Sequence, residues 1–327
     1  MAPPRFPRPQ RATAALLGGT ALAALLPLTL AAPATAAAGP PLCRSARQPA
    51  LAARLAADLT AALRGRTDTV AFAVHDPVSG VNCTLHGTRH FDSASVVKAT
   101  VLAAVLRRAQ EQRRELTPRE TADLRAMITH SDNDAAGALW ADLGRARLTA
   151  FLALAGMTAT VLGRDGYWGL TQITASDEMR LLDVLTDRHD VLSERWQAYA
   201  LGLMSAVVPE QRWGAPFGTP AGVTAHNKNG WLPRATRGWR VHSLGIFTGA
   251  GRDYRMAVLT DDNRSMDYGV DTIQGLALAV NRDPVGRLTN DQLSFSKAML
   301  RLSTSTRGSP RKPMVRLWVY FFTSACT

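Results

Sequence analysis

A chain of 327 residues has room for one large domain or two small ones, and an apolar content of 46% indicates a globular protein with a substantial core. The net charge of +12 belongs mostly to the ends, since residues 1–36 carry +3 and residues 284–327 carry +6. The +3 that remains over residues 37–283 argues against a nucleic-acid-binding domain.

Residues 1–36 have the layout of an export signal. Arg5, Arg8 and Arg11 precede the apolar run ATAALLGGTALAALLPLTL, and an Ala-x-Ala cleavage site follows at 34–36. We therefore expect a secreted, extracytoplasmic protein that keeps no stable membrane span after cleavage. The alternative is a single uncleaved membrane anchor.

A Pro/Gly-rich stretch at 37–49 is expected to be a linker, and periodic segments follow it. Helical spacing of apolar residues predicts helices at 51–65, 95–112, 119–129, 134–143, 146–155, 175–187, 193–207 and 267–281. Strand patterns bounded by turn residues occur at 69–76, 81–86, 222–231, 238–249 and 253–261. Strands at both ends around a helical middle predict an α+β domain over 50–283, with one antiparallel sheet and helices packed on it.

The tail at 284–327 shows no sustained period, and its apolar run VRLWVYFF is too short to span a bilayer. We expect a basic, disordered tail; the alternative is a tail that binds an envelope surface. Of the three cysteines, Cys43 and Cys83 flank the start of the domain, and export permits a disulfide between them. Cys326 would then be left over.

Lysine is rare in this chain. Of 38 basic residues 34 are arginine, and the lysines are Lys98, Lys228, Lys297 and Lys312. Arginine stays protonated at ordinary pH, whereas a desolvated lysine can accept a proton. Lys98 follows Ser95 by three residues, which on a helix places both side chains on one face. This pattern indicates a nucleophile beside its base, although the same spacing recurs at 294–297.

Two further motifs follow in order: Ser-Asp-Asn at 131–133 and Lys-Asn-Gly at 228–230. With Ser-x-x-Lys at 95–98, the set resembles the class A β-lactamase-like serine hydrolases of the β-lactamase and penicillin-binding-protein superfamily. The resemblance covers roughly residues 50–282. It implies a β-lactamase/transpeptidase-like α+β fold.

The resemblance also implies roles for single residues. Ser95 would be the nucleophile and Lys98 its base, and Ser131 would relay a proton to the leaving nitrogen. Lys228 would supply positive charge for a substrate carboxylate. The backbone N–H groups of Ser95 and Trp231 would form the oxyanion hole.

Other motif positions would bind substrate. Asn133 would contact the substrate amide, and Gly230 would let the substrate lie against its strand. Asn229 departs from the Thr or Ser of the family, yet its side chain could still bind a carboxylate. Asp132 is expected to be structural, since all three residues of Ser-Asp-Asn also suit a helix N-cap. His226 shares the face of Lys228 and Gly230 by strand alternation, but we expect it to be a satisfied polar histidine.

The family's deacylating glutamate loop is missing. Residues 162–178 read LGRDGYWGLTQITASDE, without a Glu-x-x-Leu-Asn pattern, and Asp165 is the only acid before the predicted helix. Glu178 falls within that helix, where we expect a solvated surface role. Four aromatic residues could line a cleft or belong to the core: Tyr167, Trp168, Trp213 and Trp231. Only Trp231 is favoured as a lining residue, because it directly follows the Lys-Asn-Gly motif.

We therefore expect an exported serine hydrolase that forms an acyl-enzyme on Ser95, with β-lactam hydrolysis as the first hypothesis. Alternatives are a D-Ala-D-Ala-type peptidase or esterase, and a β-lactam-acylated binder with slow turnover. A non-catalytic protein that binds cell-wall ligands is the alternative from another class. The expected partner is a small β-lactam or a peptidoglycan-like peptide, with no nucleic acid. No cofactor or metal is implied, because no His/Cys cluster has ligand spacing. The oligomeric state stays open.

Overall fold

The computed structural model describes residues 41–282. The expected export signal, the tail and Cys326 lie outside the described residues. No helix within residues 41–282 is long and apolar enough to cross a membrane.

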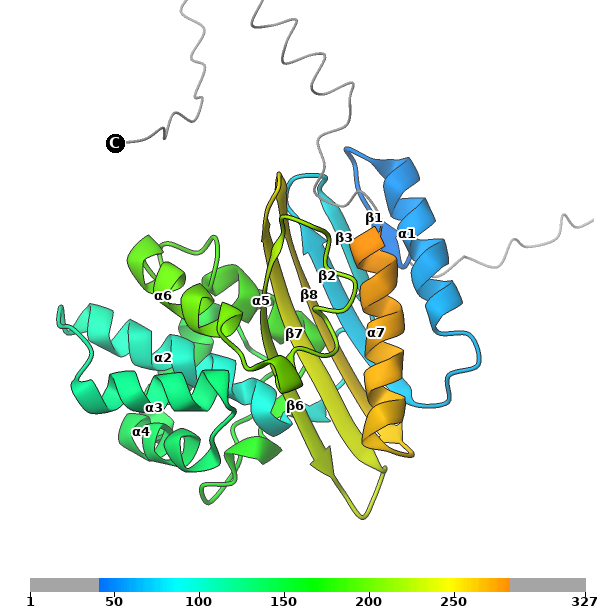
Figure 1. Ribbon diagram of the computed structural model, residues 1–327. Helices are drawn as coiled ribbons and strands as arrows, with labels where there is room; N and C mark the ends of the chain where they lie inside the picture. Colours follow the sequence, from blue (N-terminus) through cyan, green and yellow to red (C-terminus); the bar gives the residue numbers. More distant parts are fainter. Residues whose placement is uncertain (1–40, 283–327) are drawn as a thin grey trace, which may run out of the picture. The chain divides into compact units, whose positions relative to one another are not determined.

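An antiparallel sheet of six strands forms the centre of the domain (Figure 1). Strands β2 and β8 pair with each other, so segments from the two ends of the domain meet in the middle of the sheet. This confirms the predicted sheet assembled from distant segments. The order across the sheet is β1 (Cys43–Arg44), β3 (Val81–Leu85), β2 (Thr69–Asp76), β8 (Arg252–Asn263), β7 (Trp239–Gly249) and β6 (Thr224–Pro233).

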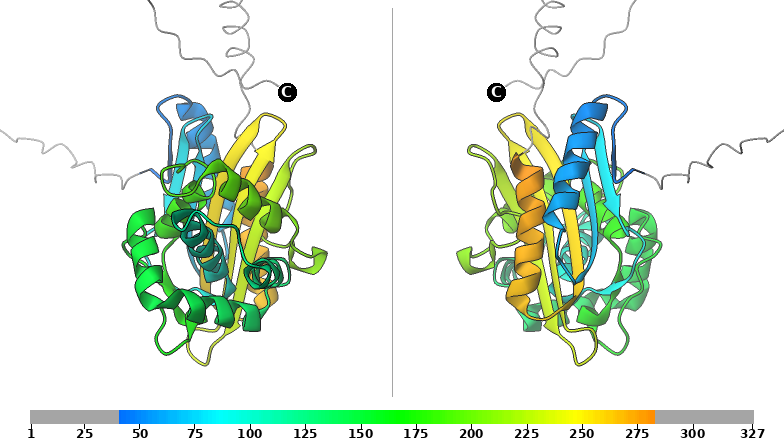
Figure 2. Two further views of the ribbon diagram at one scale, coloured as in Figure 1. Left: turned by 90° about the vertical axis from the view of Figure 1, so that its left-hand side faces the viewer. Right: turned by 90° about the vertical axis from the view of Figure 1, so that its right-hand side faces the viewer.

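Helices cover both faces of the sheet, as Figure 2 shows from two sides. On one face α1 (Pro49–Ala62) and α7 (Met266–Arg282) lie side by side. The other face carries α2 (Val97–Glu111), α3 (Pro118–Thr129), α4 (Asn133–Ala155), α5 (Ala175–Val184) and α6 (Glu194–Ser205). The domain is therefore α+β, as predicted, with three layers.

Each face of the sheet has its own hydrophobic core. In α1 the leucines at 51, 55 and 59 recur every four residues, so all three point to one side and are buried against the sheet. The second core joins α2 and the other middle helices to the opposite face. Burial of this much apolar surface is the main force that holds the helical layer on the sheet.

Three two-residue strands were not predicted, because so short a segment shows no period. One of them, β1, lies within the expected linker and pairs with β3, so part of that linker belongs to the sheet. The others, β4 (Phe91–Asp92) and β5 (Gln172–Ile173), pair with each other. The two helices expected at 134–143 and 146–155 are two segments of α4, joined at Gly144 with φ of +69°.

The predicted disulfide between Cys43 and Cys83 is present. The two cysteines are direct neighbours across the β1–β3 pair. The bond therefore fastens the first residues of the described chain to the edge of the sheet.

Candidate active site

Ser95 lies on a short 3₁₀ turn, η1 (Ala94–Val96), that leads directly into α2. The sequence placed Ser95 on the helix itself; the structure places it in the turn before Val97. Ala94 has φ of +48°, a left-handed conformation that non-glycine residues rarely adopt. The turn leaves Ser95 partly exposed, while Lys98 on α2 is fully buried.

The ammonium group of Lys98 is surrounded by oxygen atoms. Its Nζ donates to the backbone oxygen of Ser131 at 2.6 Å, to Ser131 Oγ at 3.1 Å and to Asn133 Oδ1 at 2.7 Å. Burial lowers the pKa of Lys98 to about 8, against the opposing effect of the nearby Asp132 carboxylate. Lys98 can therefore lose its proton near neutral pH.

Lys228 reaches the same serine from the sheet side. Its Nζ donates to Ser131 Oγ at 3.0 Å and to the backbone oxygen of Asn229 at 2.8 Å. Burial lowers the pKa of Lys228 well below its ordinary value, and the charge of Lys98 lowers it further. Because both lysines donate to Ser131 Oγ, the hydroxyl hydrogen of Ser131 is left to donate elsewhere.

The Ser-Asp-Asn motif supplies the N-cap of a helix and two residues of the candidate site. Asp132 is the N-cap of α4, and its Oδ1 accepts from the backbone N–H of Ala135 at 2.8 Å. The expected structural role of Asp132 is confirmed. Ser131, with φ of +57°, and Asn133 on either side of it both contact Lys98.

Gly230 brings the edge strand β6 against the turn that carries Ser95. A β-carbon at position 230 would lie 2.8 Å from the backbone nitrogens of both Ser95 and Val96, which is closer than real side chains come. Only glycine therefore permits this approach. Trp231 follows directly on the same strand, and its ring lies 5.8 Å from that of Trp213.

The side chain of Asn229 is engaged inside the protein. Its Nδ2 donates to the backbone oxygens of Gln211 and Trp213, both at 2.9 Å, and its Oδ1 accepts from Ser243 Oγ at 2.6 Å. This corrects the expected contact with a substrate carboxylate, because strand alternation turns Asn229 away from the face of Lys228.

The hydrogen-bonding atoms of His226 all have partners within the protein, as expected. Its Nδ1 donates to the backbone oxygen of Leu201 at 2.8 Å, and its Nε2 accepts from Thr248 Oγ1 at 2.9 Å. Both ring nitrogens are therefore used within the protein.

Trp168 lies at the site, although its place in the sequence gave no reason to favour it as a lining residue. It begins the short turn η2 (Trp168–Leu170), and its ring lies 4.8 Å from Lys98 Nζ. Aromatic composition alone favoured a core position for it. Its neighbour Tyr167 is 66% exposed, and Asp165 is exposed as well.

Glu178 is fully buried, so the expected solvated role was wrong. Neither of its carboxylate oxygens has a hydrogen-bond partner among the described residues. Burial raises its pKa to about 8, with a further contribution from Asp177. The prediction failed because α5 packs between the sheet and α2 and α4, which leaves position 178 on an inner face.

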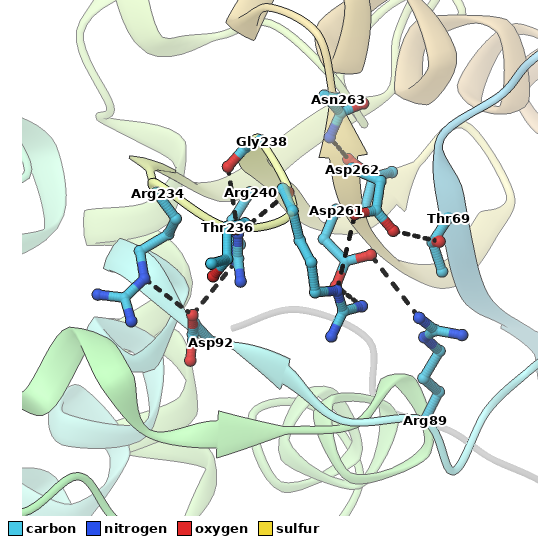
Figure 3. A network of polar contacts seen from close by, with 12 residues as sticks. Thr69, Arg89, Asp92, Arg234, Thr236, Gly238, Arg240, Asp261, Asp262 and Asn263 are labelled. Carbon is cyan, nitrogen blue, oxygen red and sulfur yellow. Dashed lines mark hydrogen bonds and ion pairs between the residues drawn. The ribbon is translucent and has the colours of Figure 1, made fainter.

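Asp92, on β4, contacts side chains from β5 and from the β6–β7 hairpin, and Figure 3 shows the two arginines of the hairpin. It precedes Ser95 by three residues, and its Oδ1 accepts from Gln172 Nε2 on β5 at 2.6 Å. Its Oδ2 lies 3.2 Å from Arg240 Nε and 3.5 Å from Arg234 Nε, two residues at the β6–β7 hairpin.

The buried His242 also holds the backbone of Asp92. Thr260 N–H donates to Nδ1 of His242 at 3.1 Å, so Nε2 carries the hydrogen and donates to the backbone oxygen of Asp92 at 2.8 Å. Burial lowers the pKa of His242 to about 4, which keeps the ring neutral. The backbone before Ser95 is thus held by side chains from β5, β7 and the β6–β7 hairpin.

The chain is similar to known proteins in both sequence and fold. A family model described as the Beta-lactamase enzyme family matches residues 54–123 and 121–283. A protein of Mycobacterium tuberculosis named "Putative lipoprotein LppW" is 29% identical over 196 residues, which is 58% of this chain and 62% of that protein. The chain thus matches less than two thirds of the length of this relative.

Two solved structures share the fold. The class A β-lactamase of Bacteroides cellulosilyticus has a TM-score of 0.63 at 17% identity, covering 75% of this chain and 100% of that one. The β-lactamase of Sphaerobacter thermophilus has a TM-score of 0.60 at 21% identity, covering 69% of this chain and 95% of that one. At these identities the likeness concerns the fold.

Proposed function

The chain belongs to the β-lactamase enzyme family, and we propose that it is an exported serine hydrolase that forms an acyl-enzyme on Ser95, with β-lactams as substrates. One observation carries the proposal: Lys98 and Lys228 both donate to Ser131 Oγ, and the strand β6 that carries Lys228 packs against the turn of Ser95. A serine hydroxyl needs a base before it can attack a carbonyl, and the buried Lys98 amine is suited to that task.

Acylation begins with proton transfer from Ser95 Oγ to the neutral amine of Lys98. The Ser95 oxygen attacks the carbonyl carbon, and the carbonyl oxygen becomes an oxyanion bound by the N–H groups of Ser95 and Trp231. Loss of one such donor typically costs about 3 kcal/mol of transition-state stabilisation. The close approach of Gly230 keeps β6 against the nucleophile's turn.

Collapse of the oxyanion breaks the carbon–nitrogen bond of the amide. Ser131 donates its hydroxyl proton to the leaving nitrogen and takes a proton in return from the lysines that donate to it. The product is an ester between Ser95 and the acyl group. In a β-lactam the released amine stays attached to the acyl group, because the broken bond belonged to a ring.

In this scheme Lys228 binds the substrate carboxylate. Burial and the neighbouring Lys98 lower its pKa, so its charged form is disfavoured without a ligand. A carboxylate beside Lys228 would favour the charged form again. Substrate binding and protonation of Lys228 are therefore expected to support each other.

Export is part of the proposal. The basic and apolar pattern of residues 1–36, with its Ala-x-Ala site, supports it. The relative LppW carries the word lipoprotein in its name, which also favours the cell envelope.

The test is a time course of intact-protein mass spectra with a penicillin and a cephalosporin, comparing the mature protein with Ser95→Ala. We expect a covalent adduct that Ser95→Ala abolishes. A transient adduct with consumption of antibiotic would indicate β-lactamase turnover, whereas a lasting adduct would indicate a binder or peptidase. Ligand binding that survives Ser95→Ala without any adduct would support the non-catalytic alternative and overturn the proposal.

A further inference from the structure

We propose that Trp168 determines the lifetime of the acyl-enzyme, because its indole closes the side of Lys98 from which a water molecule would be activated. The inference rests on the proposed acylation of Ser95. It adds a residue whose role is to exclude water.

Lys98 Nζ is enclosed by oxygen atoms on one side and by an aromatic ring on another. It donates hydrogen bonds to three oxygen atoms of Ser131 and Asn133, with Nζ–O distances of 2.6 to 3.1 Å. The ring of Trp168 lies 4.8 Å from the same nitrogen. The side chain of Lys98 has no exposed surface.

Hydrolysis of the acyl-enzyme needs a water molecule and a base. Water must attack the acyl carbon while a base accepts its proton, after which the bond to Ser95 Oγ breaks and the proton returns to that oxygen. Lys98 is the base proposed for acylation, and it can serve this step only if a water molecule reaches its Nζ. The indole of Trp168 occupies part of the space that such a water needs.

Hydrogen bonds hold the backbone of Trp168 in place. Thr171 N–H donates to the backbone oxygen of Trp168 at 3.0 Å, and Ser93 N–H donates to the backbone oxygen of Thr171 at 2.8 Å. The loop is compact, since a β-carbon on Gly163 would lie only 2.1 Å from the backbone oxygen of Tyr167. The turn of Trp168 is thus fastened to the residue that precedes η1.

Chemical labelling of lysine tests, without any substrate, whether Trp168 covers Lys98. Lys98 and Lys228 are the only lysines in the part of the chain that the structure describes, so a peptide map after cyanate treatment at pH 8 is simple to interpret. We expect Lys98 of the unmodified protein to stay unlabelled and Trp168→Ala to be carbamylated on Lys98. Tyr167→Ala is the matched control, because Tyr167 is adjacent and largely exposed.

The second readout is the lifetime of the penicillin adduct after free ligand is removed. We expect Trp168→Ala to lose the adduct at least tenfold faster, whereas Trp168→Phe and Tyr167→Ala stay within threefold of the unmodified protein. Trp168→Leu replaces Trp168→Ala if the alanine variant does not fold.

The outcomes separate the two proposals. If Lys98 stays unlabelled in both Trp168→Ala and Trp168→Leu, the proposal that Trp168 covers Lys98 is overturned. Labelling of Lys98 without a shorter adduct lifetime would overturn the proposed control of that lifetime. Failure of the unmodified protein to form any adduct would overturn the acyl-enzyme instead and, with it, the inferred control of its lifetime. The labelling result would still report whether Trp168 covers Lys98.

Discussion

Gly230 lies directly against the backbone nitrogen of Ser95, so closely that a β-carbon on Gly230 would come within 2.8 Å of it. The two residues are 135 positions apart in the chain. Their contact joins the edge strand β6 to the turn of the proposed nucleophile, and it sets the geometry in which both segments can face one carbonyl group.

Gly230→Ala is expected to slow acylation of Ser95 by about a hundredfold, since displacing β6 weakens a donor of the proposed oxyanion hole. The rate of adduct formation by mass spectrometry measures this. Gly202→Ala on α6 is the control, because a β-carbon there would have no neighbour within 4 Å. Equal rates in both variants would contradict the proposed geometry.

Acylation is expected to accelerate as the pH rises toward about 8 and then to level off. Burial lowers the pKa of Lys98 to about 8, and only the neutral amine accepts a proton from Ser95. Below that pH the rate should fall about tenfold per unit. Adduct formation measured between pH 6 and 9.5 gives the profile, and Lys98→Arg should form no adduct at any pH. A flat profile would exclude Lys98 as the base.

Glu178 is expected to make the protein less stable as the pH rises. Burial raises its pKa from 4.5 to about 8, so its contribution is complete below pH 4.5 and is lost as the pH rises through about 8. The expected slope is about 1.4 kcal/mol per pH unit within this window. Urea unfolding at several pH values should show the slope, and Glu178→Gln should remove it. Glu194→Gln, at an exposed helix start, should leave it unchanged.

The disulfide between Cys43 and Cys83 is expected to stabilise the domain without affecting the site. It closes a loop with a sequence separation of 40, for which chain entropy predicts about 4 kcal/mol. The double variant Cys43→Ala, Cys83→Ala should lose that much free energy of unfolding and still acylate Ser95 at the same rate below its melting temperature. A large loss of rate would instead connect this edge of the sheet to the site.

The amino-acid sequence by itself determined the class of fold and the chemical identity of the candidate site. Periodicity located the long helices and strands, because each repeats its pattern over two or more turns or pleats. The rarity of lysine drew attention to Lys98 and Lys228, and the disulfide followed from cysteine number and export. These features are local, or depend on residue type alone.

Tertiary structure decided which way side chains point and what covers them. Glu178 is buried because several elements close around α5, and Trp168 meets Lys98 because a loop 70 residues later folds over α2. Strand alternation sets the face of Asn229, but the partners that occupy its side chain come from Gln211 and from Ser243 on β7. Such contacts join residues far apart in the chain, and burial depends on all of their neighbours together, so no pattern within a single segment specifies them.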